Sequence, residues 1–271
     1  MPEAPPAPTD ASPPAPPQAA PPTVSVVMTT YDAIGHVAEA VESVFAQTFP
    51  DWELVIVDDG STDGTRELLQ EYAEADARVR LLLVPRMGRI PALNTAVREA
   101  RGEFIANLDA DDISYPDRLQ REVDYLRAHP DVGLVGASVV DRIDDQGRPL
   151  PPVTRPTDED EIRRLLGRQG AFFHSSVMYR RSVWRELGGF DTTFSCYEDY
   201  DFVVRMLSRS RVHFLEGALG AKRRHPGQAF DQVHWTNKGY RMRARIGWRY
   251  LRGVRWDPAV AVRTVGFLFM T

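Results

Sequence analysis

The sequence predicts an α/β protein in which helices cover both faces of a mostly parallel sheet. Short β-branched apolar runs alternate with segments whose apolar residues recur at helical spacing, beginning near residue 24. Acidic turn clusters follow two of these runs, and in open parallel sheets the ligand binds beyond the carboxyl ends of the strands. The chain has 271 residues, 43% of them hydrophobic, which is enough to bury one substantial core.

The beginning of the chain differs from the rest in composition. Residues 1–22 contain ten of the 21 prolines and six alanines, with no large apolar side chain beyond Met1. A segment with so little surface to bury cannot offset its own chain entropy. We therefore expect a disordered or polyproline-like tail ahead of the folded chain.

Strands and helices alternate through the first half of the folded chain. The apolar runs VSVVMT and ELVIV are typical of strands that are buried on both faces. Pro91 favours the start of a helix, where its missing N–H costs no hydrogen bond. We predict strands at 24–29, 53–57, 79–84 and 103–108, and helices at 36–48, 65–77 and 91–101.

The pattern is weaker beyond residue 130. The stretch DDQGRPL is typical of a hairpin turn, and Gly188-Gly189 ends a short helix. The apolar residues of EDYDFVVRMLSR fall on one face of a helix. We predict strands at 132–140 and 174–180, and helices at 158–167, 181–187 and 198–209.

Carboxylates gather directly after the strand at 103–108. The run Asp109-Ala110-Asp111-Asp112 supplies hard oxygen ligands of the kind that Mg²⁺ and Mn²⁺ prefer, and these ions leave positions free for phosphate oxygens. The chain has neither a GxGxxG nor a GxxxxGK[ST] loop for binding phosphate, so a carboxylate-held metal is the alternative. Tyr31 and Asp59 follow two other strands, where a ring can stack on a base and a carboxylate can accept a hydrogen bond from a pyrimidine imide. Together these residues predict a nucleoside diphosphate site along the strand ends.

These motifs and their order resemble family 2 glycosyltransferases, the inverting enzymes with the GT-A fold. The resemblance covers about residues 23–228 and rests on VSVVMTTYD, VESVFAQTFPDWELVIVDDGSTDGT, GRIPALNTAVREARGEFIANLDADDISYPDRL, FHSSVMYRRSVWRELGGFDTTF, YEDYDFVVRM and RRHPGQ. It implies a GT-A domain with a nucleotide-sugar half at 23–115 and an acceptor half at 116–228. A basic, amphipathic, helical extension is expected at 229–271.

The resemblance also implies roles for individual residues. Asp199 of the Glu198-Asp199 pair resembles the catalytic base, and a helix start suits both carboxylates because the helix dipole favours negative charge there. The metal, Mn²⁺ or Mg²⁺, is expected at Asp111, Asp112 and His225. For His174, a structural role is the alternative to a contact with acceptor or phosphate. The residues expected to bind substrate are Thr29, Tyr31, Asp59, Asp109, Asp111, His174 and Glu198.

Several positions depart from the family's pattern. Thr29-Thr30-Tyr31-Asp32 stands where Pro-x-Tyr-Asn is common, and Met87 replaces the usual Asn before Gly88. The Gln-x-x-Arg-Trp signature of processive members is missing, because Arg255-Trp256 has no glutamine three residues before the arginine. This departure favours the addition of a single sugar.

The expected function is metal-dependent, inverting transfer of a sugar from a nucleoside-diphosphate sugar to a hydroxyl of a glycan or lipid-linked acceptor, as in polysaccharide or cell-envelope biosynthesis. A UDP-sugar is favoured because of Tyr31 and Asp59. One alternative is a sugar-phosphate nucleotidyltransferase, which would need a glycine-rich basic loop after the first strand, where TTYDAIGH stands. The other alternative is a non-catalytic nucleotide- or glycan-binding module. The acidic start of the helix at 198–209 argues against it.

Net charge, cysteine content and hydropathy limit the classes of partner and the cellular location that we expect. The formal charge of −5 argues against general nucleic-acid binding, and a single cysteine excludes an internal disulfide. No apolar run reaches the roughly 18 residues of a membrane span, and no signal peptide is recognisable. We expect a cytoplasmic protein, either free or peripheral at the inner face of the plasma membrane. The basic amphipathic helix expected at 240–256 either lies on an anionic membrane surface or packs on the domain with its arginines in solvent.

Overall fold

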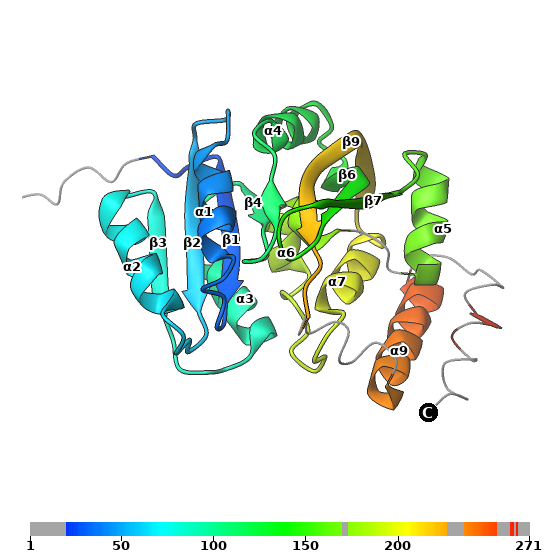
Figure 1. The fold of residues 1–271 in the computed structure, drawn as a ribbon. Coiled ribbons are helices and arrows are strands. Elements are labelled where there is room, and N and C mark those ends of the chain that lie inside the picture. Colours follow the sequence, from blue (N-terminus) through cyan, green and yellow to red (C-terminus); the bar gives the residue numbers. More distant parts are fainter. Residues whose placement is uncertain (1–19, 170–172, 227–235, 254–260, 263, 265–271) are drawn as a thin grey trace, which may run out of the picture.

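The computed structural model describes residues 20–169, 173–226, 236–253, 261–262 and 264. Residues 1–19 of the predicted tail and 254–256 of the predicted basic helix lie outside the described residues. The chain forms a nine-stranded mixed sheet with helices on both faces (Figure 1). The strand order is β3-β2-β1-β4-β8-β6-β9-β5, and β7 pairs with β6. The predicted α/β class is confirmed.

The N-terminal half is a parallel α/β unit. Strand β1 pairs in parallel with β2 and β4, and β2 pairs in parallel with β3. Its elements are β1 (Val24–Thr30), α1 (Val37–Phe45), β2 (Trp52–Asp58), α2 (Thr65–Ala75), β3 (Val79–Leu83), α3 (Arg89–Glu99) and β4 (Phe104–Asn107). Every predicted boundary in this half lies within three residues of the observed one. Helix α3 begins two residues before Pro91, which still lies in the first turn, where its missing N–H has no partner to lose.

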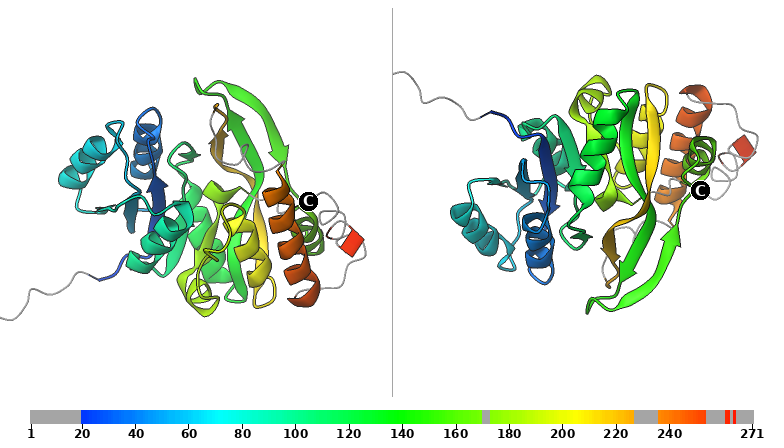
Figure 2. Two further views of the ribbon diagram at one scale, coloured as in Figure 1. Left: turned by 90° about the horizontal axis from the view of Figure 1, so that it is seen from below. Right: turned by 90° about the horizontal axis from the view of Figure 1, so that it is seen from above.

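The remaining elements extend the same sheet in mixed orientation. They are β5 (Ile113–Ser114), α4 (Arg118–Ala128), β6 (Val132–Ile143), β7 (Pro149–Thr154), α5 (Glu159–Gln169), the 3₁₀ turn η1 (His174–Ser176), β8 (Met178–Arg180), α6 (Arg181–Glu186), α7 (Glu198–Met206), β9 (Arg211–Arg223) and α9 (Asn237–Gly253). Strand β8 is antiparallel to both β4 and β6, whereas β6 and β9 are parallel. The predicted hairpin turn is present between β6 and β7, which curve away together from the helices (Figure 2).

Two predicted elements are wrong in part. The strand predicted at 174–180 is a strand only from Met178, because the hydroxyls of Ser175 and Ser176 bond to Asp112 and to the main chain of Phe173 in a 3₁₀ turn. The helix predicted at 198–209 ends at Met206.

Strand β9 was not predicted from the sequence, although it has 13 residues. Its sequence RVHFLEGALGAKR contains glycines that weaken a strand pattern. Gly220 is needed because a Cβ there would lie 2.3 Å from the main-chain oxygen of Ile113 on β5. The glycine that weakens the pattern therefore allows the close pairing of β5 with β9.

Two apolar layers cover the faces of the sheet. Helices α1, α2 and α4 cover one face, and α3, α6, α7 and α9 cover the other. Representative fully buried side chains are Val41, Leu69 and Val123 on the first face and Ala96, Phe202 and Ile246 on the second. The sheet is therefore packed on both faces, and the loops at its strand ends extend from a rigid core.

Helix α9 packs on the domain. Its apolar residues Met242, Ile246 and Tyr250 are buried in the same core as α7. Figure 2 shows α9 lying beside α7. Of the two alternatives for this segment, the structure shows packing on the domain. Among the described residues, no helix has the length and apolar character needed to cross a membrane.

Candidate active site

The predicted site residues gather at one edge of the sheet. Tyr31 follows β1, Asp59 follows β2 and Asp109 follows β4, so all three stand at carboxyl ends of parallel strands. Glu198 and Asp199 open α7, on the other side of the same edge. Residues from both halves of the chain thus meet in one place.

Asp59 holds the loop that follows β3. Its carboxylate accepts hydrogen bonds from the main-chain N–H groups of Met87 (2.6 Å) and Gly88 (3.0 Å), and from Arg86 Nη1 (2.9 Å). Asp59 is only 2% exposed, whereas the Arg86 side chain is 53% exposed. Arg86 is the only side chain among these three donors, so it can leave Asp59 without movement of the main chain.

Arg86 also covers the predicted stacking ring. Its guanidinium carbon lies 3.2 Å from the centroid of the Tyr31 ring, in a cation–π contact. Tyr31 is 47% exposed, and Thr29 lies two residues before it on β1, half-buried. Arg86 therefore contacts both Asp59 and Tyr31, and Thr29 lies on the strand that leads to Tyr31.

Three carboxylates form a candidate metal site. Asp109, Asp111 and Asp112 each place an oxygen within 4.8 Å of the other two, and such hard oxygens fit Mg²⁺ or Mn²⁺. Asp112 lies deepest, and its carboxylate accepts hydrogen bonds from Ser175 Oγ (2.5 Å) and the main-chain N–H of Arg223 (2.9 Å). Burial, and then the charges of Asp111 and Asp109, raise the pKa of Asp112 well above its ordinary value. A divalent cation would relieve this repulsion.

His225 lies beside these carboxylates. Its Nε2 is 3.1 Å from Asp111 Oδ2, and its Nδ1 is 3.0 Å from the main-chain oxygen of Pro226. Asp111 and His225 are therefore placed where a shared ligand can reach both, and Asp112 lies next to Asp111. The structure brings the three predicted metal ligands together.

Arg89 joins the two sides of the site. Its Nη2 is 2.7 Å from Asp109 Oδ1, and its Nε is 2.9 Å from Glu198 Oε1. Burial alone would raise the pKa of Asp109, but Arg89, His174 and Lys222 together outweigh burial and hold that pKa well below its ordinary value. Asp109 is thus ionised and paired, and Glu198 is held by the same guanidinium.

Asp199 faces His174 across a short gap. Its Oδ2 is 3.8 Å from His174 Nδ1, and the other ring nitrogen of His174 is 4.0 Å from Asp109 Oδ1. Within the described part of the chain, His174 Nδ1 is buried and has no hydrogen-bond partner. Burial, and then the charge of Glu198, raise the pKa of Asp199 above its ordinary value. A raised pKa makes Asp199 a stronger base than an ordinary aspartate.

The start of α7 is set by an unusual backbone conformation. Tyr197, directly before Glu198, has a φ of 65°, in the left-handed region that non-glycine residues seldom adopt. Its ring is buried in the core, and Arg243 of α9 lies over it, 5.9 Å from the centroid. Strained backbone of this kind persists where the surroundings hold it, often at functional sites. Here the packing of Tyr197 orients the carboxylate pair.

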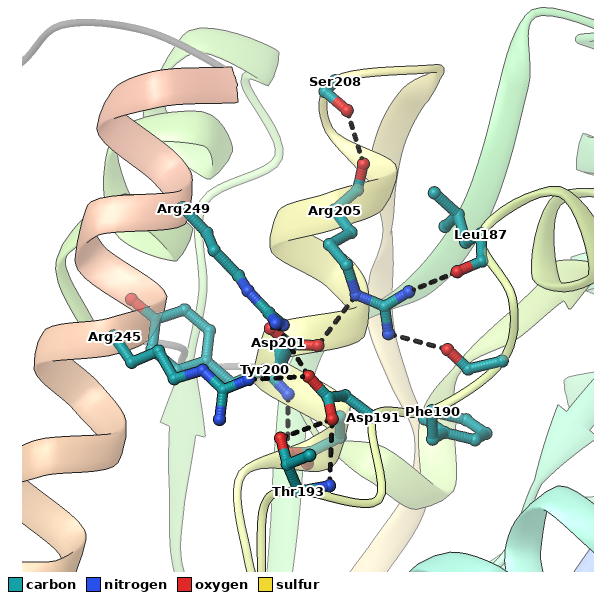
Figure 3. Close-up of polar contacts among 12 residues, drawn as sticks. Leu187, Phe190, Asp191, Thr193, Tyr200, Asp201, Arg205, Ser208, Arg245 and Arg249 are labelled. Atoms are coloured by element: carbon teal, nitrogen blue, oxygen red, sulfur yellow. Dashed lines mark hydrogen bonds and ion pairs between the residues drawn. The ribbon is translucent and has the colours of Figure 1, made fainter.

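An arginine network holds α7 to α9 (Figure 3). The Asp201 carboxylate is fully buried and bonds to Arg205 Nε at 2.8 Å and to Arg249 Nη1. Arg249 also reaches Asp191 at 2.7 Å, and Arg245 reaches Asp191 at 3.2 Å. Two of the arginines of α9 are thus ion-paired with the domain, in addition to the apolar contacts of that helix.

The fold and the site define a GT-A-type transferase, with acidic strand ends facing a carboxylate pair. The sequence matches Glycosyl transferase family 2 over residues 25–188. The chain belongs to this family and is a glycosyltransferase. This membership excludes the two alternatives considered from the sequence, a nucleotidyltransferase and a non-catalytic binding module.

Individual relatives and solved structures support the assignment to this family and fold. EpsE of Bacillus subtilis, described by its name as a glycosyltransferase, is 33% identical over 221 residues, which are 79% of this chain and 77% of EpsE. Among solved structures, TarS 1-349 of S. aureus in complex with UDP-GlcNAc superposes with a TM-score of 0.70 at 20% identity, covering 92% of this chain and 72% of that one. The mannosyltransferase PcManGT of Pyrobaculum calidifontis, in complex with GDP-Man and Mn²⁺, superposes with a TM-score of 0.65 at 24% identity, covering 92% and 70%. These structural likenesses confirm the GT-A fold.

Several residues that organise the site were missed in the sequence. Arg89 and Arg223 connect carboxylates that are far apart along the chain, and Ser175 supports Asp112. The placement of Arg89 after Gly88, at a strand-end loop, was a usable signal. Nothing in the sequence marks Arg223, because its hydrogen-bond partners come from three separate segments, at Glu39, Asp111–Asp112 and Asp144–Asp145.

We predict that the α7–α9 network stabilises the protein. Changing Arg249→Met leaves Asp201 with only Arg205 and should lower the free energy of unfolding by about 1–3 kcal/mol, the range for hydrogen bonds to charged groups. Arg241→Met, on the exposed side of the same helix, is the matched control and should have little effect. Urea unfolding measures both. Equal losses in the two variants would contradict this role of Arg249.

Proposed function

We propose that this glycosyltransferase is metal-dependent and inverting, and that it moves a sugar from a nucleoside-diphosphate sugar, with UDP favoured, to a hydroxyl of a glycan or lipid-linked acceptor. The observation that carries the proposal is the placement of Asp199 opposite the strand-end carboxylates, with His174 between Asp199 and Asp109. In this proposal, residues 23–115 bind the donor and 116–228 contribute the acceptor side.

The nucleoside binds at the ends of β1 and β2. Thr29, Tyr31 and Asp59 line its pocket, and Arg86 moves off the Tyr31 ring when the base stacks there. Asp59 is placed to accept a hydrogen bond from a pyrimidine imide once Arg86 leaves it. Support comes from the UDP-GlcNAc bound by TarS, which has the same fold.

The diphosphate binds beside Asp109, Asp111 and Asp112. Asp111, Asp112 and His225 are the residues that would hold a Mn²⁺ or Mg²⁺ ion, and the Mn²⁺ in PcManGT supports this choice of ion. When bound, the ion supplies positive charge that stabilises the departing diphosphate. The chain's own part is to keep oxygen ligands grouped while Arg89 pairs with Asp109.

Asp199 accepts the proton of the acceptor hydroxyl as that oxygen bonds to the sugar carbon and the bond to the diphosphate breaks. Glu198 is unsuited to this step because Arg89 holds its carboxylate at 2.9 Å. The base and the departing diphosphate act from opposite sides of the sugar, so the configuration at that carbon inverts. His174 lies between the two sides and contacts substrate in this scheme.

We predict that Asp199→Asn suppresses transfer by about 10²–10⁴-fold, the contribution of a positioned general base. Donor affinity should change little, because Asp199 does not contact the nucleotide. Glu198→Gln, at the neighbouring position, should cost less. Sugar transfer and donor binding are measured side by side on all three proteins, so that a misfolded variant is recognised by lost binding. Near-normal transfer by Asp199→Asn together with inactive Glu198→Gln would assign the base to Glu198 instead.

The fall of kcat at low pH, the acid limb of the pH–rate profile, should report the pKa of Asp199, the proposed base. Asp199 must be ionised to accept a proton, and its pKa is raised by burial and by Glu198, so kcat should fall with acidification at a pH above the ~3.9 of an ordinary aspartate. Glu198→Gln removes the neighbouring charge and should move this limb to lower pH. A limb that stays in place, or moves upward, contradicts the assignment.

Nucleotide binding should depend on the metal through Asp111. Calorimetry of UDP binding to Asp111→Asn with Mn²⁺ should give the affinity that the unchanged protein shows with EDTA, because an amide is a poor substitute for a carboxylate ligand. Asp117→Asn, an exposed carboxylate next to α4, is the control and should retain the Mn²⁺ effect. If Asp111→Asn binds UDP with a full Mn²⁺ effect, Asp111 does not hold the metal.

A further inference from the structure

A second group of ligand-type side chains lies next to the carboxylates. His36 directly precedes α1, Asp145 lies in the β6–β7 turn and His225 follows β9. His36 Nε2 is 3.2 Å from Asp145 Oδ1, and the rings of His36 and His225 lie with centroids 5.0 Å apart. One ligand atom from each of the three residues lies within 4.8 Å of the other two.

His225 has the hydrogen bond of a ligating histidine. Its Nδ1 lies 3.0 Å from the main-chain oxygen of Pro226, which can only accept, so a proton on Nδ1 would be donated there. Metal-bound histidines commonly donate their other ring N–H to a main-chain carbonyl in this way. The other ring nitrogen, Nε2, lies 3.1 Å from Asp111 Oδ2 and faces the space that Asp111 borders.

The segments that carry the three residues are anchored to one buried side chain. Arg223 is 1% exposed, and its guanidinium donates to the main-chain oxygen of Asp145 (3.2 Å) and to Glu39 Oε2 of α1 (2.6 Å). His225 is two residues further along the chain. The turn, the start of α1 and the end of β9 are therefore held together without any metal, as a preorganised site requires.

We propose that His36, Asp145 and His225 form a second divalent-cation site that selects Zn²⁺. Two imidazoles and one carboxylate suit Zn²⁺, which binds three such ligands and keeps a fourth position open, whereas Mg²⁺ prefers oxygen ligands alone. This set has two imidazoles and one carboxylate, whereas the ligands proposed for the donor-side metal, Asp111, Asp112 and His225, have two carboxylates and one imidazole.

The two sites share His225, so an ion in the second site should affect the ion bound next to Asp111. A Zn²⁺ ion bound to His225 Nε2 withdraws that nitrogen from the Asp111 side. Zn²⁺ should therefore weaken the binding of Mn²⁺ next to Asp111 and inhibit transfer. This consequence rests on the proposed function, whereas Zn²⁺ binding itself does not.

The test is calorimetry of Zn²⁺ binding to the full chain without a histidine tag and without added Mg²⁺ or Mn²⁺, which would compete for His225. The unchanged protein should bind one Zn²⁺, and His36→Asn and Asp145→Asn should each weaken this binding roughly tenfold or more, since even outer-shell changes cost 10–100-fold. His129→Asn is the matched control, because His129 precedes β6 at the end opposite Asp145. X-ray absorption at the zinc edge should show two imidazoles.

The outcomes separate this site from the proposed function. Binding that survives in both His36→Asn and Asp145→Asn, losses of equal size in His129→Asn, or an oxygen-only shell around zinc each overturn the second site. If zinc binds as expected and the protein shows no transfer, the second site stands and the proposed function fails. Where transfer is observed, Zn²⁺ should raise the Mn²⁺ concentration needed for half-maximal rate in the unchanged protein and not in His36→Asn.

Discussion

The buried guanidinium of Arg223 connects the parts of the chain that form the site. Its main-chain N–H donates to Asp112, and its side chain donates to the main-chain oxygen of Asp111 and to Glu39. A guanidinium taken out of water without acceptors would cost several kcal/mol, so these partners have to stay in place. Because Arg223 ends β9, which pairs with both β6 and β5, it joins the far half of the sheet to the acidic loop after β4.

The site that results is crowded with negative charge. Five carboxylates gather there: Asp109, Asp111, Asp112, Glu198 and Asp199. Arg89 bridges two of them, Asp109 and Glu198. The raised pKa values of Asp112 and Asp199 show that like charges and burial act on both. In the proposed function the same crowding favours a divalent cation near Asp111 and Asp112 and keeps Asp199 basic.

Much of this arrangement could be predicted from the sequence, for a physical reason. Parallel strands carry β-branched runs that are legible in the sequence, and their carboxyl ends meet at one edge, so Tyr31, Asp59 and Asp109 could be placed together. Strand β9 could not be predicted, because its glycines weaken the strand pattern in the sequence. Gly220 is required for close pairing with β5, and pairing with β6 is visible only in the folded chain. The link from Arg89 to Glu198 spans 109 residues and is visible only in the folded chain. The sequence left two alternatives for the C-terminal helix, a membrane surface or packing on the domain, and the structure shows its apolar residues packed on the domain.

The central claim is that a base and a leaving diphosphate act from opposite sides of the sugar. Proton NMR of the anomeric signal tests it directly, during early turnover of UDP-sugars with Mn²⁺, with water or a simple glycan as acceptor. An α-linked donor should give a β-configured product before mutarotation. A product that first appears with the α configuration would contradict the account, because retention requires a different use of the carboxylates than the one derived from Asp199.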